Sequence, residues 1–106
     1  MEASVCKGCG ADSEAKVIYE QALQQYGVQP QITMVFEEMS ELQKELCKYL
    51  RGKTTPQHIA NIAEEIADVE IMLEQMKLLF DIADEVNEAR VSKTQRLKSR
   101  LERTDG

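Results

Sequence analysis

The chain of 106 residues has the composition of one small helical domain and not of a disordered segment, since 42% of its residues are hydrophobic and it has only 2 prolines and 5 glycines. Its formal net charge of −6 opposes binding to nucleic acid. We find neither an apolar run long enough to span a bilayer nor a signal-peptide pattern, and we therefore expect a cytoplasmic protein without a membrane partner.

Residues 1–12 show no apolar period, and we expect them to form a flexible tail before a single helical domain at residues 13–106. Cys6 and Cys9 have the spacing of half a zinc site, but only Cys47 and His58 remain as further ligands. Reduced, inert thiols are therefore the favoured interpretation, with a structural zinc as the alternative.

Apolar periodicity and helix-end signals predict four helices. The first runs from an N-cap at Ser13 to Tyr26, with Gly27 as its stop and the segment 28–30 as a break before a proline. The second helix is expected at about residues 31–51.

The last two helices are expected at residues 56–80 and from Asp81 to about Arg103. Thr55 is the predicted N-cap of the third helix, with Pro56 at its first position, and Asp81 is the predicted N-cap of the fourth. The third helix is apolar on two sides, and one chain rarely covers both. The sequence therefore predicts an all-α, antiparallel bundle of about four helices, completed by self-association into a homo-dimer or homo-tetramer.

Two acidic clusters, at residues 37–41 and 64–68, place carboxylates three and four residues apart on helices, where like charges repel. Projected at roughly 100° per residue, Glu65 falls inside the apolar arc of its helix and Asp68 at the margin, whereas Glu64 points away. A desolvated carboxylate is costly without a partner. The position of Glu65 therefore disfavours the alternative that both clusters are ordinary solvated helix surface.

Antiparallel packing of the second and third helices would bring Glu38, Glu41, Glu65 and Asp68 into one pocket. Oxygen ligands without histidine or thiolate suit Mg²⁺, with Mn²⁺ as the alternative. The sequence therefore predicts a divalent metal site between these helices.

The fourth helix supplies cations. Lys93 projects into its apolar stripe, and Arg96 and Arg100 lie beside it. These groups could bind phosphate oxygens that a metal does not neutralise, or they could complement the dipole at the helix C-terminus.

The set Glu37-Glu38-x-x-Glu41 and Glu65-x-x-Asp68, with Val69 following, resembles the MazG-type all-α nucleoside triphosphate pyrophosphohydrolases, relatives of the dimeric dUTPases. The resemblance spans about residues 32–101. It implies a helical bundle that forms dimers or tetramers and uses magnesium to convert a nucleoside triphosphate to the monophosphate and pyrophosphate.

The resemblance also implies roles for particular residues. Glu38, Glu41, Glu65 and Asp68 would be metal ligands and Glu37 an additional acid, while Lys93 and Arg100 would approach phosphate. Leu97 stands where the family often has an asparagine, so the resemblance gives no sugar or phosphate contact at that position.

We therefore expect a magnesium-dependent enzyme that hydrolyses a (deoxy)nucleoside triphosphate, with Glu37 or Glu41 as the base and a role in clearing the nucleotide pool. Phosphate would be bound by Lys93, Arg96 and Arg100. The alternative is a non-enzymatic regulatory module whose acidic groove docks a basic partner helix.

Overall fold

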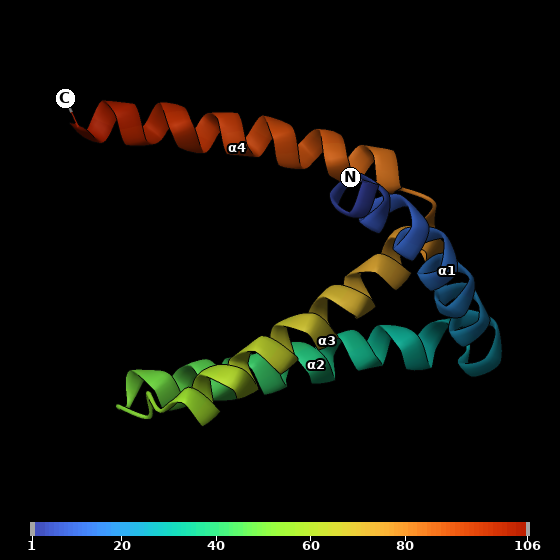
Figure 1. Cartoon of the computed structure of the whole chain (residues 1–106), viewed down its shortest axis with the longest axis horizontal. Helices are drawn as coiled ribbons and strands as arrows, with labels where there is room; N and C mark the ends of the chain where they lie inside the picture. Colours follow the sequence, from blue (N-terminus) through green and yellow to red (C-terminus); the bar gives the residue numbers. More distant parts are fainter. Residues whose placement is uncertain (1, 106) are drawn as a thin grey trace.

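The computed structural model describes the backbone of residues 2–105 and the side chains of residues 13–103, and over this range it contains helices and no strand. The four helices are α1 (Glu2–Tyr26), α2 (Val28–Leu50), α3 (Pro56–Phe80) and α4 (Ala83–Asp105) (Figure 1). The predicted all-α class and the four helices are therefore confirmed. None of the helices, over the described residues, is long and apolar enough to cross a bilayer.

The first helix begins at Glu2, so the predicted start at an N-cap on Ser13 is wrong. Two further predictions were a flexible tail at residues 1–12 and, as an alternative, a structural zinc bound by Cys6 and Cys9. Both predictions concern residues whose side chains lie outside the described range.

A single residue, Gly27, separates α1 from α2. Its φ of 96° and ψ of 167° form a conformation that residues with a Cβ rarely adopt. The break is therefore at Gly27, and the prediction that residues 28–30 interrupt the helix is wrong. Pro30 lies in the first turn of α2, where backbone N–H groups have no intrahelical acceptor and a proline is tolerated.

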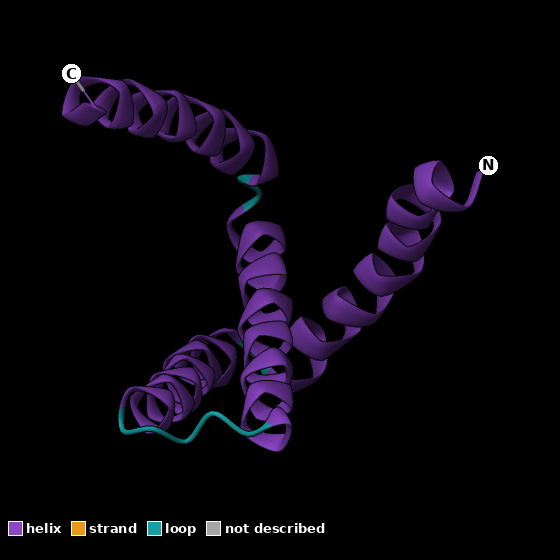
Figure 2. Ribbon diagram, turned by 60° about the vertical axis from the view of Figure 1, so that its left-hand side comes forward, coloured by secondary structure: helices purple, strands orange, loops and turns teal. Residues whose placement is uncertain are grey.

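Helices α2 and α3 form an antiparallel pair, which is the best-packed part of the chain. The loop between them, residues 51–55 (Figure 2), contains Gly52, whose φ of 97° is positive. The loop ends at Thr55, whose hydroxyl accepts a hydrogen bond from the backbone N–H of His58. The predicted cap at Thr55 and the predicted start of α3 at Pro56 are confirmed.

The turn between α3 and α4 differs from the prediction. Asp81 is in the left-handed region at φ 56° and ends α3, with its N–H donating to Leu78 O and the N–H of Ile82 donating to Lys77 O. This pair of hydrogen bonds is the Schellman arrangement that closes helix C-termini. Asp81 is therefore not the N-cap of α4, which begins at Ala83.

Helix α4 leaves the α2–α3 pair, and over the described residues α3 is the helix whose backbone it approaches (Figures 1 and 2). On the apolar stripe of α4, Val86 is half-buried close to the turn, but Leu97 and Leu101 remain 48% and 58% exposed. Within one chain, α4 therefore does not complete a bundle.

Candidate metal-binding site

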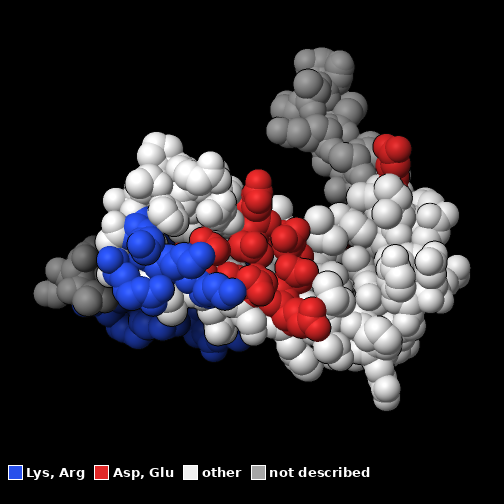
Figure 3. Space-filling view, turned by 90° about the horizontal axis from the view of Figure 1, so that it is seen from below, with Lys and Arg blue, Asp and Glu red and all other residues white. Residues whose placement is uncertain are grey.

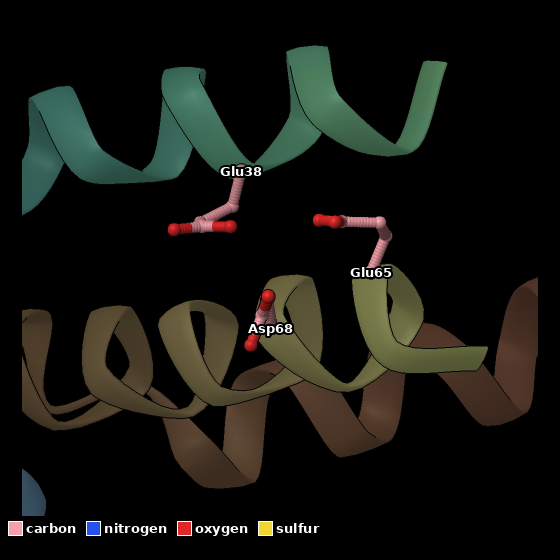
Figure 4. Close-up of side chains that lie close together, drawn as sticks. All are labelled: Glu38, Glu65 and Asp68. Carbon is pink, nitrogen blue, oxygen red and sulfur yellow. The ribbon is translucent and has the colours of Figure 1, made fainter. Parts of the chain in front are cut away.

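Three carboxylates from α2 and α3 converge. One oxygen each of Glu38, Glu65 and Asp68 lies within 4.8 Å of the others (Figure 4). Glu38 projects from α2 toward α3, and Glu65 and Asp68 come from consecutive turns of α3. Glu38 and Glu65 are half-buried and Asp68 is exposed, so the group is open to solvent on one side. We call these three residues the carboxylate cluster.

The register of the helix pair explains this convergence. Farther along the pair, the side-chain amide of Gln31 donates a 2.7 Å hydrogen bond to the Gln75 carbonyl oxygen, and both residues are buried. From Gln31 to Glu38 is about two helical turns along α2, and from Gln75 back to Asp68 is about two turns along α3. Antiparallel packing in this register therefore sets Glu38 opposite Asp68.

The carboxylate cluster is electrostatically unfavourable without a cation. Burial, followed by the neighbouring Asp68 carboxylate, raises the pKa of Glu38, and the same two causes raise the pKa of Glu65. In addition, Glu65 Oε1 is buried and has no hydrogen-bond partner among the described residues. An unpaired buried carboxylate oxygen is costly, and a bound cation would relieve that cost.

The other two acids of residues 37–41 lie at the edge of the carboxylate cluster. Glu37 is exposed, and Glu41 has a 51% exposed side chain whose Oε1 is 3.8 Å from Lys44 Nζ. Both charges contribute to the raised pKa of Glu38, so they are close to the carboxylate cluster. The structure thus brings together three of the four predicted ligands and places Glu41 beside them.

Sequence reasoning missed Glu45. This residue is only 9% exposed, its Oε2 accepts a 3.1 Å hydrogen bond from Lys48 Nζ, and its Oε1 is buried without a partner among the described residues. The charge of Glu45 also contributes to the raised pKa of Glu65. The available signal was helical spacing, since Glu38, Glu41 and Glu45 fall on one side of α2 at intervals of three and four.

The predicted phosphate-binding cations do not reach the carboxylate cluster within one chain. Lys93, Arg96 and Arg100 are exposed on α4, which makes no approach to α2. Acidic side chains gather on the face of the α2–α3 pair that is seen from below in Figure 3, whereas α4 lies above the pair in Figure 1. Within a single chain, the structure therefore does not bring these predicted phosphate-binding residues to the carboxylate cluster.

Three carboxylate oxygens at this spacing could hold a metal ion. Carboxylate oxygens are ligands that hard divalent cations such as Mg²⁺ and Mn²⁺ prefer. Comparison of the chain with models of protein families, with curated proteins and with solved structures gave no match.

Proposed function

We propose that the protein is a magnesium-dependent hydrolase that converts a (deoxy)nucleoside triphosphate to the monophosphate and pyrophosphate. The observation that carries the proposal is the convergence of Glu38, Glu65 and Asp68, with a Glu65 oxygen buried and unpartnered. Magnesium in proteins pairs a few carboxylates with substrate phosphates, which fits an open cluster of this kind. The resemblance of the acidic motifs to MazG-type enzymes supports the same reaction.

In this proposal Glu38, Glu65 and Asp68 bind Mg²⁺ or Mn²⁺. The side chain of Glu41 turns inward from the edge of the carboxylate cluster and completes the ligand set. The bound metal would neutralise phosphate charge and lower the pKa of water. Glu37 or Glu41 would accept the proton of the attacking water, since both are exposed close to the cluster.

Self-association forms part of the proposal. Large apolar side chains are exposed on every helix, including Phe36 at 62%, Ile66 at 41% and Leu97 at 48%. Large exposed apolar patches usually mark an interface. A homo-dimer, or a homo-tetramer built from two dimers, would cover it.

The proposal is tested by incubating purified protein with Mg²⁺ and each natural or damaged nucleoside triphosphate in turn, and by measuring pyrophosphate and monophosphate. We expect both products from at least one nucleotide, none after chelation of the metal, and none from Glu65→Gln. Absence of product from every nucleotide would overturn the proposal.

A non-enzymatic module that docks a basic helix is the second candidate, favoured by the exposed acidic face of the α2–α3 pair (Figure 3). The two candidates differ in their response to a non-hydrolysable nucleoside triphosphate. An enzyme should gain thermal stability from this nucleotide only when Mg²⁺ is present, because the metal bridges carboxylates and phosphates. A docking module should show no such dependence.

A further inference from the structure

Two lysines of α2 lie beside the carboxylate cluster of their own chain. Lys44 Nζ is 3.8 Å from Glu41 Oε1, and Lys48 Nζ donates a 3.1 Å hydrogen bond to Glu45 Oε2. These four residues are spaced so that acids and lysines alternate along one side of the helix. The charges of Glu41 and Glu45 are among the causes that raise the pKa of Glu65, so both acids are close to the cluster. The lysines that they hold are therefore close to it as well.

The Lys48–Glu45 pair differs from an ordinary surface ion pair. A pair between two exposed side chains usually contributes little, because both are free to move in water. Here the acid is 9% exposed, with Oε1 buried and unpartnered among the described residues, whereas the side chain of Lys48 is 35% exposed. An ammonium group has three N–H donors, of which Glu45 engages one. The buried acid therefore holds a partly exposed cation whose other donors could bind a second anion.

The positions of the two ammonium groups suit a chain of linked phosphates. Lys44 and Lys48 reach back to the acids three residues earlier, which lie about one and two helical turns from Glu38 toward the α2–α3 loop. On the face seen from below in Figure 3, basic side chains border the acidic ones. Arg51 and Lys53 are exposed in the loop and extend the row of cations. A polyphosphate with one phosphoryl group at the metal would therefore meet Lys44 and then Lys48.

We propose that Lys44 and Lys48 form a polyphosphate-binding subsite that continues the carboxylate cluster along α2. The assignment rests on the proposed function, in which the metal at the cluster neutralises only part of the triphosphate charge. The two lysines would bind the phosphate oxygens that the metal does not reach, through charge-assisted hydrogen bonds. Glu45 would be a positioning residue, which acts through Lys48. Both lysines belong to the chain that carries the cluster, so this subsite needs no second copy.

Inorganic triphosphate with excess Mg²⁺ is the probe of the subsite, since it contains neither base nor sugar. In isothermal titration calorimetry the wild type should bind this probe, and Lys44→Ala/Lys48→Ala should bind it about tenfold or more weakly. The same variant should bind Mg²⁺ alone as tightly as the wild type or more tightly, because two repelling cations are gone. No binding of the probe by the wild type, equal binding by the variant, or an equal loss of Mg²⁺ binding would overturn the inference.

Lys77→Ala is the control matched to Lys48→Ala, which should by itself bind the probe more weakly than the wild type. Lys77 donates to Glu74 at 2.8 Å with the same spacing of three residues, but it lies on α3 and lines a hollow to which α1 and α4 also contribute. The control removes the same charge and the same kind of ion pair, and it should keep the wild-type affinity. A loss as large as that in Lys48→Ala would show that net charge alone governs binding, contrary to the inference.

A double-mutant cycle tests the positioning role of Glu45. Glu45→Gln removes a negative charge close to the probe, which by itself favours the binding of an anion. In the Lys48→Ala background only this gain should be measured. In the wild-type background the gain should be smaller or reversed, because Lys48 also loses its charged partner. Equal changes in the two backgrounds would overturn the positioning role.

Hydrolysis and binding together separate this inference from the proposed function. For a nucleotide that the protein hydrolyses, Lys44→Ala/Lys48→Ala should raise KM about tenfold or more. An unchanged KM would overturn the subsite while the proposed function stood. Binding of inorganic triphosphate through both lysines, in a protein that hydrolyses no nucleotide, would instead refute the proposed function and leave the subsite intact.

Discussion

At the scale of single residues, Glu65 is the most constrained group of the candidate site. Its Oε1 is buried without a partner among the described residues, and burial together with the Asp68 carboxylate raises its pKa. Glutamate at such a position is unfavourable for the folding of the chain alone, where an apolar or neutral side chain would avoid the desolvation. A cation changes this balance because it is attracted to all three carboxylates at once.

Replacement of Glu65 by Gln removes the charge and keeps the shape. We expect the melting temperature of the metal-free protein to stay equal or increase, and the stabilisation by Mg²⁺ to be lost. The control is Glu64→Gln, because Glu64 is exposed and lies outside the carboxylate cluster. This control should keep the Mg²⁺ effect. An undiminished Mg²⁺ effect in Glu65→Gln would remove Glu65 from the metal site.

The raised pKa values of Glu38 and Glu65 predict a dependence on pH. Both values lie above the usual 4.5, so the folded state takes up protons at a higher pH than the unfolded chain does. The unfavourable charge is present above the folded-state pKa and disappears as the pH falls toward 4.5. In metal-free protein, Glu38→Gln/Glu65→Gln should therefore melt above the wild type at neutral pH, and the difference should shrink on acidification. A difference that is constant with pH would contradict this expectation.

At the scale of the elements, the α2–α3 pair positions the site. Val35 and Met72 are its buried apolar residues, and the hydrogen bond between Gln31 and Gln75 lies beside them. A buried polar pair of this kind specifies register, because a shifted pair would leave both amides without partners. The same register places Glu38 opposite Asp68.

A double-mutant cycle tests the glutamine pair. Gln75→Met leaves the buried Gln31 amide without its acceptor and should lower the free energy of unfolding by about 1–3 kcal/mol. The double variant Gln31→Met/Gln75→Met leaves neither amide unpaired and should recover most of that loss. Denaturant unfolding of the wild type, both single variants and the double variant provides the coupling energy. Additive effects would contradict a register-setting hydrogen bond.

The turn between α3 and α4 contains a strained residue. Asp81 adopts a positive φ of 56°, a conformation in which glycine has no steric penalty. We expect Asp81→Gly to stabilise the protein by about 0.5–1 kcal/mol, measured by denaturant unfolding. Gly52 occupies the corresponding position after α2 at φ 97°, so Gly52→Ala should destabilise by about 1 kcal/mol. Effects of the same sign in the two variants would contradict this interpretation of the turn.

At the scale of the whole molecule, the chain is elongated, with principal extents of 48 × 35 × 32 Å, because α4 extends away from the other helices (Figure 1). Only Val35 and Met72 are buried hydrophobic residues over the described side chains. A core this small makes folding and association one coupled process, as in many obligate dimers.

The melting temperature should therefore rise by several degrees when the protein concentration is increased about a hundredfold. Leu97→Asp places a charge on the apolar stripe of α4 and should lower the melting temperature at high concentration more than at low concentration. The control is Ser92→Asp, on the other side of the helix, which should keep the wild-type dependence. A wild-type melting temperature that is independent of concentration would show a stable monomer.

Local sequence determined the existence of the four helices, because the signals that predict them act within one or two turns of the chain. These signals are the apolar spacing, the N-cap at Thr55 followed by Pro56, and the helix break at Gly27. It also determined that Glu38, Glu65 and Asp68 could meet, since a short loop makes two helices antiparallel and helical periodicity places these acids on facing sides. The metal, the reaction and the assembly remain predictions.

Tertiary structure alone decided that Glu45 is buried and where α4 points. Glu41 and Glu45 are four residues apart on α2, yet Glu41 is exposed and Glu45 is buried, because burial depends on the neighbouring helix and not on the residue itself. The direction of α4 follows from the left-handed conformation of Asp81, which the sequence pattern of a helix cap did not predict. This turn carries Lys93 and Arg96 away from the carboxylates of their own chain, because a change of direction at one residue moves every later residue with it.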